Sequence, residues 1–137
     1  MDRLETDKLT LLVVEGKYLH LTIHSDEEIT LEDVPAVVEF LDQFTEPVPI
    51  LIERRGRYSI SAAVQIAMYK GTKRRLKAVA YLERDYLDSL LTRIARVSYF
   101  QHTKVKSFYT REDAVEWLKS AFNSAPIEPG PHDRNTE

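Results

Sequence analysis

The chain of 137 residues contains no cysteine. This absence excludes disulfide bonds, cysteine nucleophiles and thiolate metal sites, and it fits a reducing compartment. No apolar run approaches the roughly 20 residues that a helix needs to cross a bilayer. The first five residues are too polar and too acidic for a signal peptide. We therefore expect a cytoplasmic protein without a membrane span.

The chain also lacks an excess of positive charge. Its net charge of −3 argues against general nucleic-acid binding, which usually needs a basic surface. Basic residues do gather near residues 54–57 and 70–77, but a helix of about 12 residues between them would separate the two groups by roughly 18 Å. Solvated loop charge explains both groups, and a small anion bound by Arg54, Arg55 and Arg57 is the alternative.

Recognisable catalytic motifs are missing as well. The sequence has no G-x-S-x-G elbow, no glycine-rich phosphate loop and no dinucleotide fingerprint. Its four histidines do not have the spacing of a metal motif. His20 and His24 would lie roughly 13 Å apart on an extended strand, too far to share an ion. We expect no metal, no cofactor and no catalytic residues, and hence a protein that is not an enzyme.

What the sequence does contain is an alternation of strand and helix patterns. Residues 9–14 and 18–23 read as two strands, and Gly16 between them can take the positive φ of a tight hairpin. Three further segments, 48–53, 76–82 and 105–109, are apolar enough for parallel strands that are covered on both faces. Charged residues make up 30% of the chain and hydrophobic residues 43%, which suits one globular domain.

Four segments have helical periodicity. Thr30 caps a helix that ends before Pro47, a second runs from about Tyr58 or Ser59 to a stop at Gly71, and Thr110 caps the last. The helix expected over residues 85–100 carries a continuous apolar stripe, and any part of it that the sheet leaves uncovered would mark a dimer face or a lipid-like pocket. The residues of this stripe are Leu87, Leu90, Leu91, Ile94 and Val97.

These elements predict a single α/β domain. It would consist of an N-terminal antiparallel hairpin leading into a mostly parallel sheet of about five strands, with four covering helices and right-handed crossovers. Residues 1–7 would form a short N-terminal arm and residues 8–123 the domain. Residues 124–137, which carry three prolines and almost nothing apolar, would form a disordered C-terminal tail.

Two sequence segments, together with the order of the elements, resemble members of the STAS-like superfamily. They are KAVAYL at residues 77–82 and SFYTREDAVEWL at residues 107–118. The superfamily includes the bacterial sporulation anti-sigma factor antagonist and small STAS/SEC14-like proteins of unknown function. The resemblance implies a STAS-like fold and a non-enzymatic protein-interaction or regulatory module, with a protein partner or self-association as a homodimer. The SEC14-like side of the resemblance implies the alternative, a carrier of a lipid-like or anionic small molecule.

The phosphorylatable antagonists carry an Asp-Ser-Ser-Gly-like motif after the central strand. Residues 53–61 here read ERRGRYSIS, without the Asp-Ser pair or the glycine after it, which argues against a kinase-operated switch. Ser59 is the nearest candidate for phosphorylation and Ser61 the next, since phosphate is favoured at a helix N-terminus. Plain helix capping by serine is the more common explanation of such residues.

Overall fold

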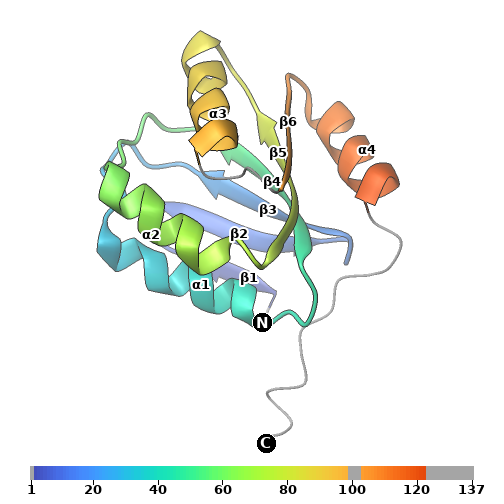
Figure 1. Ribbon diagram of the computed structural model, residues 1–137, viewed down its shortest axis with the longest axis horizontal. Helices are drawn as coiled ribbons and strands as arrows, with labels where there is room; N and C mark the ends of the chain where they lie inside the picture. The colour runs from blue at the N-terminus through green and yellow to red at the C-terminus, as the bar shows by residue number, and fades with distance from the viewer. Residues whose placement is uncertain (1, 99–102, 123–137) are drawn as a thin grey trace, which may run out of the picture.

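Among the residues that the structure describes, six strands form one sheet in which the order along the chain is also the order in space (Figure 1). The computed structural model describes residues 2–98 and 103–122. Antiparallel pairing joins the first three strands, and parallel pairing joins the third strand to the fourth and so on to the sixth. The strands are β1 (Arg3–Glu5), β2 (Leu9–Val14), β3 (Tyr18–Ile23), β4 (Val48–Arg54), β5 (Leu76–Leu82) and β6 (Lys104–Phe108). The predicted α/β class, hairpin and parallel sheet are confirmed.

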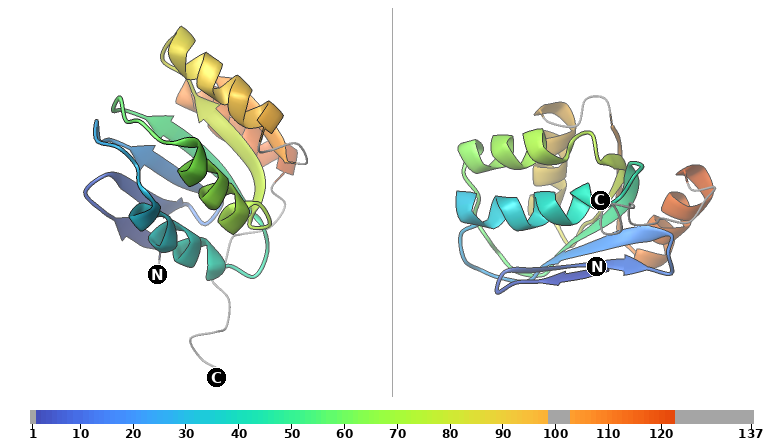
Figure 2. Two further views of the ribbon diagram at one scale, coloured as in Figure 1. Left: turned by 60° about the vertical axis from the view of Figure 1, so that its left-hand side comes forward. Right: turned by 90° about the horizontal axis from the view of Figure 1, so that it is seen from below.

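In the described part of the chain, four α-helices cover the two faces of this sheet. Helices α1, α2 and α3 each connect two parallel strands and lie on one face, whereas α4 lies on the other (Figure 2). The side chains of β4 and β5 that pack with α4 alternate with those that face α1 and α2, as the period of a strand requires. The helices are α1 (Val34–Asp42), preceded by the 3-10 turn Leu31–Asp33, α2 (Ala62–Thr72), α3 (Tyr86–Ser98) and α4 (Arg111–Phe122).

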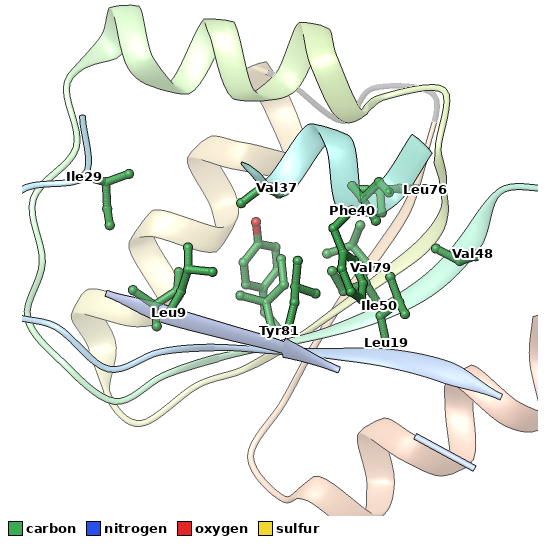
Figure 3. Packing of buried hydrophobic residues seen from close by; sticks show 14 of the residues in the cluster. Leu9, Leu19, Ile29, Val37, Phe40, Val48, Ile50, Leu76, Val79 and Tyr81 are labelled. Atoms are coloured by element: carbon green, nitrogen blue, oxygen red, sulfur yellow. The ribbon is translucent and has the colours of Figure 1, made fainter. Parts of the chain in front are cut away.

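The larger of two apolar clusters lies between the sheet and helices α1 and α2. Leu19, Ile50 and Val79 are adjacent across three parallel strands and are almost fully buried (Figure 3). The smaller cluster lies beneath α4, where Leu118 packs toward Leu51 and two alanines of β5. Each central strand therefore buries both of its faces, which explains why its sequence is apolar without alternation.

The N-terminal segment differs from the expected arm. Arg3–Glu5 pairs antiparallel with β2 and adds a sixth, edge strand to the sheet. Only Leu4 of this strand packs against the core, while Arg3 and Glu5 are exposed. A three-residue strand with one buried side chain is too short to show the alternation by which a strand is recognised in a sequence.

Helix α2 also differs from the prediction at both ends. Its N-cap is Ser61, whose hydroxyl accepts a hydrogen bond from the Val64 amide at 3.2 Å, so the helix begins later than Tyr58 or Ser59. The preceding Ile60 forms a parallel bridge with Ile29 and is extended. Gly71 is not the stop, because α2 continues through Thr72. A Cβ at Gly71 would lie 2.5 Å from a Val38 methyl, so this glycine allows α1 and α2 to approach closely.

Candidate functional site

Three loops meet at the carboxyl ends of the parallel strands, where α/β proteins usually bind ligands and partners. The loop after β4 lies against the loop after β3, since a Cβ at Gly56 would lie only 2.0 Å from the carbonyl oxygen of Ser25. The Arg57 amide donates to Asp26 at 2.7 Å, and the Ile29 amide donates to the Ser59 carbonyl at 2.8 Å. These contacts fix the path of the segment that carries the predicted arginines and serines.

The three predicted anion-binding arginines point to different places. Arg54 is buried beneath α3, and its guanidinium carbon lies 4.5 Å from the centre of the Tyr81 ring. Arg55 is exposed and donates to Glu53 at 3.0 Å on the opposite face of the sheet. Arg57 pairs with Asp85 at the start of α3. The structure therefore brings Arg54 and Arg57 near the same helix but does not gather all three around one position.

The carboxylate of Asp88, in the first turn of α3, is completely buried and binds the loop before its own helix. It accepts hydrogen bonds from the Arg84 amide at 2.9 Å and from the Arg84 guanidinium at 2.8 and 3.1 Å. Arg57 lies 3.8 Å away. Burial alone would raise the pKa of Asp88, but the bonds from Arg84 and the charges of Arg84 and Arg54 outweigh it and lower the pKa below the ordinary 3.8. Asp88 is therefore a charged anchor at neutral pH.

A polar cluster continues beneath α3, between the helix and the ends of β4 and β5. Arg54 donates to the Tyr58 hydroxyl at 3.2 Å and to the Thr92 hydroxyl at 3.4 Å. Thr92 is almost fully buried. Burial raises the pKa of Tyr81 to about 12, so its phenol is protonated under any ordinary condition. The interior beneath α3 is thus polar around Arg54 and Thr92, and Tyr81 lies where it borders the apolar cluster beneath α1 and α2.

Helix α3 consequently has an inverted orientation. Asp88 and Thr92, which are four residues apart, face the domain, while Leu87, Leu91 and Ile94 are 50%, 37% and 45% exposed. We call these last three residues the α3 stripe. Tyr86 precedes the stripe and is 73% exposed. The sequence predicted the apolar stripe and its possible excess, but not that the buried side would be the polar one. The i, i+4 spacing of Asp88 and Thr92 shows that they share a face of the helix, but not that this face meets the core.

The two candidate serines lie at the entrance to α2 and are both exposed. Ser61 caps the helix through its hydroxyl. Ser59 contributes its backbone carbonyl to the contact with Ile29. The structure therefore gives Ser61 a structural role and leaves the phosphorylation of either serine a prediction.

A second polar group lies on the opposite face of the sheet, around Glu53. One carboxylate oxygen of Glu53 is 3.0 Å from His20 Nε2 and 3.2 Å from Arg111, which donates to it. Burial lowers the pKa of His20, so the imidazole is neutral at pH 7. The Thr22 hydroxyl lies 3.4 Å from the same Nε2 atom. A nucleophile relay needs the hydroxyl and the carboxylate on different ring nitrogens, so this arrangement is not a catalytic triad.

Over residues 2–98 and 103–122, no group of three or more His, Asp or Glu side chains is arranged to hold a metal ion. Within the same part of the chain, none of the helices combines the length and the apolar character that crossing a bilayer requires.

Comparisons with known proteins place the chain in a family and a fold. A family model described as Domain of unknown function (DUF7793) matches residues 12–121. Among solved structures, the chain is similar to a protein of the DUF3478 family from Shewanella loihica, which is described as uncharacterised with a SpoIIAA-like fold. The TM-score is 0.58 at 20% identity, and the match covers 84% of this chain and 98% of the other. No curated protein matches the sequence. The SpoIIAA-like, or STAS-like, fold is therefore confirmed, and no function follows from it alone.

Proposed function

The chain thus belongs to the family described as Domain of unknown function (DUF7793), and we propose that it is a non-enzymatic, cytoplasmic protein-interaction module that docks its partner on helix α3. One observation carries the proposal: the α3 stripe faces outward while the polar side chains of the same helix are buried. An amphipathic helix normally turns its apolar side to the core, so the reversed orientation requires a reason.

The contacts of Asp88 and Thr92 supply that reason. Rolling α3 to bury the stripe would break the bonds from Arg84 to Asp88 and from Arg54 to Thr92. It would also bring leucine side chains against the buried guanidinium of Arg54, which would then lose a polar partner at a cost of about 1–3 kcal/mol or more. The domain therefore cannot cover the stripe by itself, and covering it from outside removes apolar surface from water at about 25 cal/mol per Å².

A site-specific photo-cross-linker tests this proposal. We would place the photoreactive residue at Leu91 in the full chain, express that chain in its own cells, irradiate, and identify the products by mass spectrometry. The matched control carries the same residue at Glu39, which is exposed on α1. A docking module should give one dominant protein adduct from position 91 that is absent from position 39. Equal, diffuse labelling from both positions would overturn the proposal.

A small-molecule carrier is the second candidate, and the buried polar cluster favours it. Arg54 and Glu83 directly follow Glu53 and Leu82, which are partners in the β4–β5 register, so they are neighbours on one face of the sheet. Both are buried, yet no ion pair joins them, and Oε2 of Glu83 has no hydrogen-bond partner. A buried cation and a buried, unsatisfied carboxylate oxygen side by side suit a small ligand that carries both a donor and an acceptor.

Native mass spectrometry of the chain purified from its own cells tests the carrier hypothesis. A bound mass that is retained by the wild type and lost from Glu83→Gln would support it. The bare chain mass in both proteins, with identical melting curves, would count against it. Glu53→Gln is the control, because Glu53 lies one residue from Arg54 but points to the other face of the sheet.

Regulation by phosphate is a further part of the proposal. Ser59 and Ser61 are exposed beside Arg57 and at the start of α2, where a phosphate would meet free helix amides. Intact-mass analysis of the endogenous protein would detect a gain of about 80 Da. Tandem mass spectrometry would then assign the phosphate to one of the two serines, and its absence under all growth conditions would remove this part.

A further inference from the structure

We propose that the partner of helix α3 is α3 of a second copy of this chain, packed antiparallel about a two-fold axis. This inference rests on the proposed docking function and names its partner. The axis would pass between Leu90 and Leu91, so that Leu87 of one copy lies against Ile94 of the other.

The spacing of the apolar residues is the first argument. Together with the half-buried Leu90, the α3 stripe is symmetric about the midpoint of Leu90 and Leu91, because Leu87 and Ile94 each lie three positions from the nearer of these two leucines. A two-fold interface brings the same patch against itself, so it needs a surface that matches its own rotated image. The 4,3 spacing of Leu87, Leu91 and Ile94 is also that of a coiled-coil seam, which pairs helices along their length.

Charge at the two ends of α3 favours the antiparallel direction. Asp85 precedes the first turn, and Arg93 lies in the second half of the helix and is exposed. Antiparallel packing brings Asp85 of each copy toward Arg93 of the other, although Asp85 also binds Arg57 of its own chain and Arg84 precedes it. It also places opposite ends of the two helix dipoles together. A parallel pair would oppose like charges and like dipole ends.

The area of the patch indicates how stable the dimer is. Tyr86 and the α3 stripe expose roughly 400 Å² of side-chain surface, taking 150–250 Å² for each large apolar side chain. A stable interface buries about 800 Å² on each partner. The patch therefore supports a transient dimer that forms at roughly 0.1–1 mM chain and dissociates on dilution.

Sedimentation velocity of the full chain, from low micromolar to millimolar concentration, tests this assembly. We expect a shift from monomer to dimer with increasing concentration. Leu91→Arg should weaken the dimer by at least about tenfold, since it buries an unpaired charge at the axis. Leu31→Arg is the control, because Leu31 is also an exposed leucine, at 57% against 37% for Leu91, and is distant in sequence from α3. Circular dichroism would verify that both variants are folded.

A charge exchange tests the direction. Leu87→Glu and Ile94→Lys should each weaken the dimer. Placed together in one chain they should restore it to within about tenfold of the wild type, because the antiparallel axis sets Glu opposite Lys at both ends. In a parallel pair the same double variant would set like charges opposite each other, and the dimer would stay weakened.

The absence of cysteine allows an independent test. Leu91→Cys introduces a single thiol into the chain, and a short bifunctional thiol reagent should convert it to a covalent dimer far faster than it converts the control Leu31→Cys. A chain that stays monomeric at 1 mM, or a dimer that tolerates Leu91→Arg, would overturn the inference. If the photo-cross-linker at position 91 then captured a different protein in cells, that result would support the docking function and exclude a second copy of the chain as the partner.

Discussion

Helices α3 and α4 lie on opposite faces of the same end of the sheet and bury opposite kinds of side chain. Helix α4 turns Ala114 and Leu118 inward, where both are fully buried, and its exposed side carries acidic residues. Helix α3 turns Asp88 and Thr92 inward and leaves Leu87, Leu91 and Ile94 exposed. The two helices have similar lengths and similarly spaced apolar stripes, so amphipathicity alone does not decide which side of a helix meets the core.

The environment that each helix meets makes the difference. Beneath α4 the sheet offers Leu51 and two alanines of β5, which accept only apolar side chains. Beneath α3 it offers the buried guanidinium of Arg54, which donates to Thr92 of the helix and requires polar partners. A helix over the second surface must present polar groups, and its apolar side is then left for another molecule. Helix α4 therefore contributes its apolar side to the core of the domain, whereas α3 leaves its apolar side exposed to solvent.

The largest effect is expected where α4 meets the sheet. Leu118→Ala removes a fully buried side chain and should cost about 2–5 kcal/mol of unfolding free energy, through lost burial and the cavity left behind. Urea denaturation followed by circular dichroism measures it. A loss below about 1 kcal/mol would mean that α4 is not part of the core, and the contrast with α3 would disappear.

Replacing the anchor of α3 should have the next largest effect. Asp88→Asn keeps the shape but removes the charge that binds Arg84, at a cost of about 1–3 kcal/mol at pH 7. Asp85→Asn, at an exposed site one turn earlier, is the control and should cost no more than about 1 kcal/mol. Equal effects of the two substitutions would show that burial of Asp88 contributes nothing.

The cost of Asp88→Asn should depend on pH in a defined direction. The pKa of Asp88 is lowered in the folded chain, so the carboxylate contributes its full stability above the ordinary value of 3.8. That contribution is lost as the pH falls below 3.8 and the folded carboxylate takes up a proton. The difference in unfolding free energy between the wild type and Asp88→Asn should therefore be constant from pH 5 to 7 and shrink below about pH 4. A difference that grew on acidification would contradict the assignment.

A smaller loss is expected at Thr92. Thr92→Val preserves the volume but removes the hydroxyl that accepts a bond from Arg54, and it should cost about 1 kcal/mol or slightly more, because Arg54 keeps Tyr58. Thermal unfolding at low chain concentration measures the change. A stabilised variant would show that α3 is held over the sheet by apolar contacts after all.

The smallest effect is expected at the stripe itself. Leu91→Ala, studied at low micromolar concentration where the chain is monomeric, should change the unfolding free energy by no more than about 0.5–1 kcal/mol, since the side chain is partly in water and alanine favours the helix. Leucine-to-alanine substitution would then cost several times more unfolding free energy at position 118 than at position 91. Similar losses at both positions would place the stripe in the core.

The sequence was sufficient to predict most of the fold and little of the site. Strands β2, β3 and β5 were predicted with their observed bounds, because a hairpin with Gly16 and a mostly apolar run are local signals. The start of α2 at Ser61 depends on the bridge between Ile29 and Ile60, two residues far apart in the chain. Such a contact leaves no mark in a local pattern.

The orientation of α3 was out of reach for a related reason. The helix period identified its apolar stripe, but which side faces inward depends on Arg54, more than thirty residues earlier, and on its contacts with Thr92 and Tyr81. Arg54 itself was interpreted as a loop residue next to Arg55, whereas it is the last residue of β4 and buried. The predicted strand ended one residue too early, at Glu53, so the charge of Arg54 was expected in solvent rather than in the interior of the domain.

The agreement between chain order and spatial order in the sheet has a consequence for how the protein forms. Each strand needs only the strand made just before it, so no strand must be inserted between two that have already paired. Contacts that are near in sequence favour rapid folding, and during synthesis the layer can grow from its first hairpin outward as the ribosome releases each unit. Helix α3 and strand β6 would join late, onto a sheet that already exists.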